Sequence, residues 1–200
     1  MNRTKRNVGI FVFENAEVLD FAGPFEVFSV TSELHNHSLF NVSIVAQELS
    51  PVIAVNGLSV NPNYDFETCP DLDILIIAGG FGTRKQLANQ KALDWIAKQH
   101  QHTEYTLSIC TGSTLLGALR YLDEQPYCTH HEVYDMMEEL VPSGKPQKEK
   151  RFVQTGKIFT SGGISAGIDL SFHLVQKLLG SDIAAQTAKY MEYDHKLLIT

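Results

Sequence analysis

Four short apolar runs recur along the first part of the chain, each bounded by turn-forming residues. They are rich in β-branched side chains, which is typical of strands that are buried on both faces of a parallel sheet. The pattern therefore predicts strands at residues 7–13, 40–47, 72–80 and 105–112.

Segments with helical periodicity lie between and after these strands. Alternation of strands and helices indicates an α/β fold with a central, mostly parallel sheet, right-handed crossovers and helices on both faces. The predicted helices cover residues 18–31, 84–99, 111–119, 131–140, 165–179 and 182–191.

Two further segments depart from this alternation and predict short hairpins. Residues 51–66 contain an Asn-Gly turn between apolar runs, and residues 151–163 contain Thr-Gly-Lys between two more. The polar loop at 141–150 is too short to separate domains, so we expect residues 1–200 to form a single domain.

Composition and charge limit the kinds of partner that the protein is expected to bind. The chain is 44% hydrophobic and 20% charged, with a formal net charge of −7, which argues against a nucleic-acid partner because such binding needs clustered Lys and Arg. No apolar run approaches the roughly 18 residues of a membrane span. The N-terminal run is only about a strand long and lacks a cleavage site. We therefore expect a cytoplasmic protein without a membrane partner.

The cysteines do not suggest a disulfide framework or a zinc site. The chain has three cysteines, an odd number, and they lack the CxxC spacing of metal ligands. They are Cys69, Cys110 and Cys128. At least one thiol is therefore expected to be free.

Several polar stretches follow the ends of predicted strands. In an open parallel sheet, ligands bind outside the carboxyl ends of the strands. The stretches ENAEVLDFAGPFE, GGFGTRK and CTGS all occupy such positions and are expected to face one crevice.

Cys110 stands where a strand ends and a helix begins. The helix dipole at such a place lowers the pKa of a thiol and favours its nucleophilic form. The position is comparable to the strained nucleophile turn of hydrolases, which favours a catalytic role. The alternative is that Cys110 is a small buried residue, a common use of cysteine.

Two glycines and an aspartate are candidates to assist a nucleophile. Gly79 and Gly80 offer backbone N–H groups for developing negative charge, and an equal alternative is that they only turn the chain. A dinucleotide fingerprint is excluded because the third glycine is missing and the segment is far from the first strand. Asp20 stands in an apolar setting that would raise its pKa and let it donate a proton, unless it merely caps a helix.

The histidines are candidates for a catalytic base and, less strongly, for metal ligands. His130 could orient or deprotonate Cys110. His131 and Asp135 are one helical turn apart, but a third metal ligand is not evident, so no metal or organic cofactor is expected. Cys128 is interpreted as buried packing.

Four stretches together resemble the ThiJ/PfpI superfamily, which is related to class I glutamine amidotransferases. They are AGGFGTRK, SICTGSTLLGALRYL, THHEVYDMM and FTSGGISAGIDLSFHLV, and the resemblance extends from the first strand to about Tyr193. It implies a flavodoxin-like fold and a homodimer.

Within the superfamily, VLDFAGPFEVF, CTGS and GGISAGIDL are most similar to isonitrile hydratases and to the sensor domains of AraC-type regulators. This resemblance implies that Cys110 is the nucleophile, with Thr111 following it, and that Asp20 is its acidic partner. Gly80 would line the oxyanion site, and His130 falls where proteases and deglycases place a histidine. An Asp rather than a Glu at position 20 matches the hydratase-like branch.

The expected function is hydration of a small-molecule isonitrile to an N-substituted formamide through a thioimidate on Cys110. Two alternatives remain open. One is a glyoxalase, deglycase or amidase of the same superfamily, and the other is a non-enzymatic ligand or redox sensor.

Overall fold

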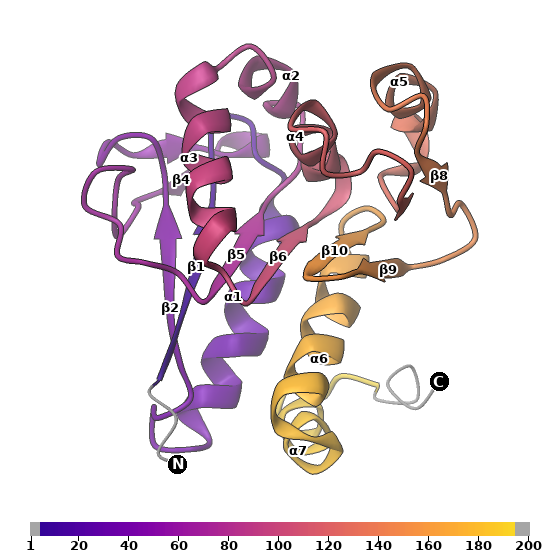
Figure 1. Ribbon diagram of the computed structural model, residues 1–200. Coiled ribbons are helices and arrows are strands. Elements are labelled where there is room, and N and C mark those ends of the chain that lie inside the picture. The colour runs from indigo at the N-terminus through magenta and orange to yellow at the C-terminus, as the bar shows by residue number, and fades with distance from the viewer. Residues whose placement is uncertain (1–4, 195–200) are drawn as a thin grey trace.

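A six-stranded sheet forms the centre of the molecule (Figure 1). The computed structural model describes residues 5–194. Neighbouring strands are parallel except at one edge, where β9 is antiparallel to β10. In sheet order the strands are β2 (Phe40–Val45), β1 (Arg6–Phe11), β5 (Ile74–Ile77), β6 (Tyr105–Ser108), β10 (Ile158–Ser161) and β9 (Phe152–Thr155).

The predicted α/β architecture is confirmed. Each of the four predicted strands is present, and the five parallel strands follow the order of flavodoxin-like folds, in which the chain passes from β2 at the edge across β1 to β5. All four side chains of Ile74–Ile77 are buried, because helices cover both faces of the sheet at β5.

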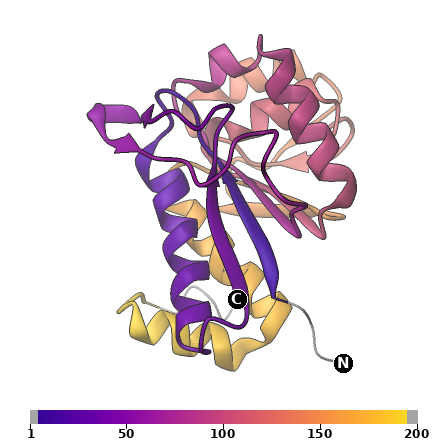
Figure 2. The ribbon, with the colours of Figure 1, turned by 90° about the vertical axis from the view of Figure 1, so that its left-hand side faces the viewer.

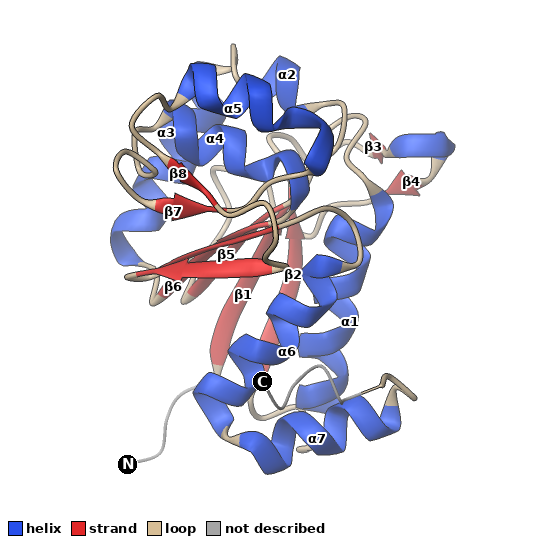
Figure 3. Cartoon of the chain, turned by 90° about the vertical axis from the view of Figure 1, so that its right-hand side faces the viewer, coloured by secondary structure: helices blue, strands red, loops and turns tan. Residues whose placement is uncertain are grey.

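The helices form two layers (Figures 2 and 3). On one face, α1 (Val18–Glu33) packs on α6 (Ala166–Leu179), which in turn packs on α7 (Ser181–Tyr190). The other face carries α2 (Thr83–Gln86), α3 (Gln90–His102) and α4 (Ser113–Ala118), with α5 (Tyr134–Leu140) beside α4.

Three predicted helices differ in detail from the structure. The helix predicted at 84–99 is split into α2 and α3, because the side chain of Asn89 accepts a hydrogen bond from the Ala92 N–H and caps a new helix. Those predicted at 111–119 and 131–140 each begin with a 3₁₀ turn, at Cys110–Gly112 and His131–Val133, before α4 and α5.

Both predicted hairpins are present. β3 (Val52–Ile53) pairs with β4 (Ser59–Val60) around a 3₁₀ turn, and β9 turns into β10 at Gly156, whose φ is +56°. A short parallel pair between β7 (Pro126–Tyr127) and β8 (Lys145–Pro146) was not predicted, because two-residue strands containing proline leave no alternating pattern.

An aromatic cluster fixes α3 on the sheet near the carboxyl end of β1. The rings of Phe66 and Trp95 stack at 4.5 Å, and Phe11 lies 5.6 Å from Trp95. Within residues 5–194, no helix is long and apolar enough to cross a membrane.

Candidate functional site

The turn between β6 and α4 holds Cys110 in a strained conformation. Its φ is 56°, a value that residues with a Cβ rarely adopt and that the surrounding structure must enforce. The Cys110 N–H donates to the carbonyl of Gly162 at 3.1 Å, and the Cys110 carbonyl accepts from the hydroxyls of Ser113 and Thr129, each at 3.2 Å. The predicted strand-to-helix elbow at Cys110 is therefore confirmed.

Glycines let the elbow press against the end of β5. A Cβ on Gly112 would lie 2.5 Å from the carbonyl oxygen of Ile77. A Cβ on Gly79 would lie 2.7 Å from Oδ2 of Asp20 and 2.8 Å from Cβ of Cys110. The absence of side chains at these two positions thus allows Cys110 and Asp20 to approach the same backbone.

Asp20 lies in the first turn of α1 and is fully buried. Its Oδ2 accepts a hydrogen bond from the Gly79 N–H at 3.0 Å, whereas Oδ1 has no hydrogen-bond partner among residues 5–194. The N-cap of α1 is Glu17, and no side chain caps this helix. The alternative in which Asp20 merely caps the helix is therefore wrong.

Burial raises the pKa of Asp20 to about 7, as the sequence predicted in direction. The charge of Glu17 raises this pKa further, while the Gly79 N–H, the Cys110 thiol and the Ile164 N–H lower it. Near neutral pH, Asp20 is therefore present in both its protonated and its ionised forms.

The Cys110 thiol behaves differently from our prediction. Burial raises its pKa to about 12, the Asp20 carboxylate adds to this rise, and the N–H groups of Thr111 and Ile164 lower it only in part. The side chain is 4% exposed, and the helix that follows has only six residues, so desolvation outweighs the helix dipole. The resting sulfur is a thiol that lies beside the Asp20 carboxyl, since both side chains lie against Gly79.

The glycine N–H groups that we expected to be free are engaged. Gly79 donates to Asp20, and Gly80 donates to the Thr111 hydroxyl at 2.8 Å. Gly80 has a φ of +119°, and a Cβ there would lie 2.4 Å from the Glu17 nitrogen, so its role is to let two loops meet. Thr111 fastens the loop after β5 to the elbow.

Sequence reasoning missed the N–H group of Ile164. Together with the Thr111 N–H, it lowers the pKa of the Cys110 thiol. Ile164 has a φ of 53° and follows Gly162 and Gly163 in the loop before α6. The double glycine of GGIS was the available signal, but it carried no assigned role.

A cavity of about 220 Å³ opens over Cys110. Of the predicted site residues, Cys110, Thr111, Gly80 and His130 line it, whereas Asp20 lies outside its lining. The cavity is also lined by Glu17, Phe81 and Arg84, which belong to stretches expected to face the crevice but had no assigned role, and by Glu132, Val133 and Ile164. The Arg84 guanidinium lies over the ring of Phe81, 5.3 Å from its centroid.

His130 faces this cavity but makes its hydrogen bond elsewhere. Its Nδ1 accepts from the Glu132 N–H at 3.3 Å, and its ring lies 4.4 Å from that of His131. Burial, and then the charge of His131, lower the pKa of His130, so the ring is neutral near pH 7. Residues 5–194 contain no group of three or more His, Cys, Asp or Glu side chains placed to hold a metal ion.

The other two cysteines lie outside this cavity. Cys128 is fully buried, its Sγ donates to the carbonyl of Gln147 at 3.5 Å, and burial raises its pKa to about 11. Cys69 is half-buried, and all three thiols are free. The interpretation of Cys128 as buried packing agrees with these contacts.

Comparisons with known proteins agree on the family. The DJ-1/PfpI family model matches residues 6–177. An isonitrile hydratase from Pseudomonas putida is 34% identical over 93% of this chain and 78% of its own length. The crystal structure of a THiJ/PfpI family protein from Pseudomonas syringae has a TM-score of 0.85 at 28% identity, covering 96% of this chain and 77% of that one.

Regulators are also similar to this chain. The HTH-type transcriptional regulator GbdR from Pseudomonas aeruginosa is 23% identical over 96% of this chain, but only 52% of the regulator is covered. The chain thus spans about half the length of that relative.

Proposed function

Because the chain belongs to the DJ-1/PfpI family, we propose that it is a cysteine-dependent, isonitrile hydratase-like enzyme. The observation that carries the proposal is the Cys110 thiol beside a buried carboxyl whose pKa is about 7, beneath a cavity of small-molecule size. The 34% identity to an isonitrile hydratase supports the choice of substrate class.

In the first step, the Cys110 sulfur attacks the terminal carbon of the isonitrile, R–N≡C. The thiol proton passes to the Asp20 carboxylate as the S–C bond forms, because a thiol with a pKa of about 12 does not ionise unaided near neutral pH. The Asp20 carboxyl then gives this proton to the same carbon. The product is a thioimidate, R–N=CH–S, on Cys110.

In the second step, water adds to the thioimidate carbon. Asp20 takes a proton from this water and passes it to the imidate nitrogen, which leaves a tetrahedral carbon bearing hydroxyl and sulfur. The C–S bond then breaks, Asp20 carries the hydroxyl proton to the sulfur, and the N-substituted formamide R–NH–CHO leaves. The N–H groups of Thr111 and Ile164 stabilise negative charge on the departing sulfur. One water is added, and nothing is oxidised or reduced.

The other lining residues bind and orient the substrate. Phe81 is 74% exposed and offers a surface for the organic group of the isonitrile. His130 is neutral and its Nδ1 is already engaged, so we assign it to the cavity wall rather than to proton transfer.

Turnover of an aryl isonitrile tests the proposal. The purified chain is expected to convert it to the aryl formamide, and Cys110→Ser is expected to have no activity above background. Methylglyoxal, assayed in parallel, represents the glyoxalase and deglycase alternative. Formamide production by Cys110→Ser, or turnover of methylglyoxal alone, would overturn the proposal.

A redox-sensing role is less well supported. Oxidation of cysteine proceeds through the thiolate, and the raised pKa of Cys110 keeps this form rare. The family resemblance further supports a homodimer, which light scattering on the purified chain tests through its mass in solution. It also supports a location in the cytoplasm.

A further inference from the structure

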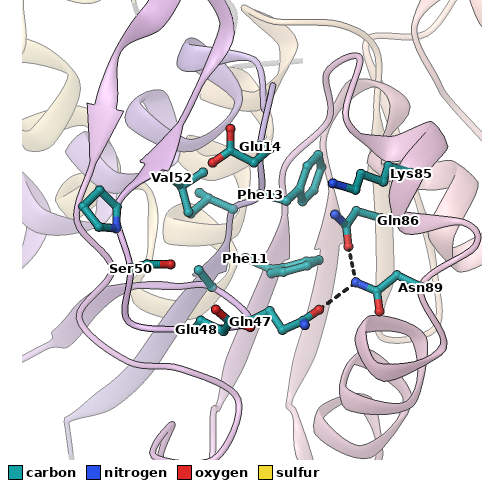
Figure 4. A pocket seen from close by; sticks show the side chains of 13 residues that line it. Phe11, Phe13, Glu14, Gln47, Glu48, Ser50, Val52, Lys85, Gln86 and Asn89 are labelled. Carbon is teal, nitrogen blue, oxygen red and sulfur yellow. Dashed lines mark hydrogen bonds between the residues drawn. The ribbon is translucent and has the colours of Figure 1, made fainter.

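A second cavity, of about 310 Å³, lies at the carboxyl ends of β1 and β2 (Figure 4). It shares no lining residue with the Cys110 cavity, and the short helix α2 stands between them. Arg84 of this helix lines the Cys110 cavity, whereas Lys85 and Gln86 line the second one. The carboxyl edge of a parallel sheet is where such folds bind ligands.

The inner wall of the second cavity is apolar. The rings of Phe11 and Phe13 lie 5.3 Å apart and are joined by Val52 from β3. Phe11 is held from behind by the stacked pair of Phe66 and Trp95. This rigid surface suits a short aliphatic chain.

Three amide side chains form a connected group beside this wall. Nδ2 of Asn89 donates to Oε1 of Gln47 at 2.7 Å and to Oε1 of Gln86 at 2.9 Å (Figure 4). Both glutamine carbonyls are thereby occupied, which fixes the direction of their NH₂ groups. Neither Nε2 atom donates to a protein acceptor within residues 5–194, although Gln86 is only 8% exposed. Both NH₂ groups are therefore available to donate to a ligand in the cavity.

Lys85 adds a charged donor to the two glutamine NH₂ groups. Lys85 follows Arg84 on α2 and forms no ion pair with any residue of the described chain. Together with Gln86 and Gln47, it presents charged and neutral N–H donors to the same cavity. A carboxylate accepts hydrogen bonds from such a set.

Carboxylates lie across the cavity, on the side of β1 and β2. Oε1 of Glu14 accepts from the Ile53 N–H at 3.0 Å, which holds this side chain at the rim. Glu48 has no hydrogen bond or ion pair within residues 5–194. The cavity therefore carries negative charge on one wall and positive charge on the other (Figure 4).

We propose that this cavity binds a small zwitterion in which a short aliphatic chain separates a primary amine from a carboxylate. The carboxylate binds Lys85 and the NH₂ groups of Gln86 and Gln47. The ammonium group binds Glu48 and Glu14, and the chain between them packs on Phe13 and Phe11.

Titration of the ¹⁵N-labelled full chain tests this proposal. The probes are β-alanine, γ-aminobutyrate and δ-aminovalerate, with butyrate and butylamine as singly charged analogues. At least one zwitterion is expected to give saturable shifts of the side-chain NH₂ signals of Gln47 and Gln86. It should bind about fivefold more tightly than either analogue, as expected for one added exposed ion pair.

Variants distinguish the two walls. Lys85→Met is expected to weaken binding of the zwitterion and of butyrate about fivefold while leaving butylamine binding unchanged. Glu48→Gln is expected to weaken binding of the zwitterion and of butylamine about fivefold while leaving butyrate binding unchanged. Lys91→Met removes an exposed lysine from α3, outside the cavity, and should change nothing. The proposal is overturned if no zwitterion gives saturable shifts, if an analogue binds as tightly, or if Lys85→Met binds like the unmodified chain. None of these readouts depends on isonitrile turnover.

Discussion

Cys110 and Cys128 are both buried thiols with raised pKa values, yet their surroundings differ in every other respect. Cys128 donates to main-chain carbonyls among packed neighbours, and it lines neither the Cys110 cavity nor the second cavity. Cys110 has a φ of 56°, lines a cavity and lies beside the Asp20 carboxyl. Burial alone therefore does not separate the two thiols. What distinguishes Cys110 is a carboxyl beside it and an open side toward a cavity.

Alanine at each position should separate the two cysteines most clearly. Cys110→Ala removes the proposed nucleophile and is expected to lower kcat/KM for an aryl isonitrile by roughly 10⁴-fold or more. Cys128→Ala removes only packing atoms, so kcat/KM should change less than about twofold while stability falls by ~1 kcal/mol. Steady-state kinetics and thermal unfolding measure both. Loss of activity in Cys128→Ala with an intact fold would break the contrast.

The free energy of unfolding should depend on pH because the pKa of the buried Asp20 carboxyl is raised. The folded state raises the pKa of Asp20 from 3.8 to about 7, so it binds this proton more tightly than the unfolded chain does. Stability from this group is fully present below pH 3.8 and is lost as the pH rises toward 7, by about 4 kcal/mol. Asp20→Asn should therefore gain stability relative to the unmodified chain over this range, as measured by urea unfolding.

An aspartate at the surface provides the matched control. Hydrogen bonds from Thr68 lower the pKa of Asp65, so its contribution is present at neutral pH and is lost as the pH falls through its lowered pKa. Asp65→Asn should thus show the opposite sign of pH dependence. A difference between Asp20→Asn and the unmodified chain that stays flat with pH would contradict the assigned burial of Asp20.

The sequence predicted the parts of this site that depend on local order. A strand followed by Cys-Thr-Gly-Ser predicts an elbow because the apolar run ends at residue 109 and a helix follows almost at once. Asp20 between apolar neighbours predicts a desolvated carboxyl. The break at Asn89 escaped prediction because the periodicity on its two sides continues in phase, whereas the cap depends on one side chain.

Other features depend on contacts between distant segments. The pKa of Cys110 follows from burial and from Asp20, 90 residues away in sequence, which together outweigh the local helix dipole. The N–H groups of Gly79 and Gly80 are consumed by Asp20 and Thr111, which no local pattern reveals. The contribution of Ile164 arises only when the loop before α6 reaches the elbow.

The pH dependence of kcat/KM for an aryl isonitrile tests most directly whether Asp20 takes the proton from Cys110. Since Asp20 must be ionised to accept it, kcat/KM should rise with pH and level off above an inflection near 7. In Asp20→Asn, any residual activity, expected to be roughly 10²- to 10³-fold lower, should lack this inflection and increase steadily with pH as the thiolate forms. The same inflection near neutral pH in Asp20→Asn, or a flat profile in the unmodified chain, would contradict the account.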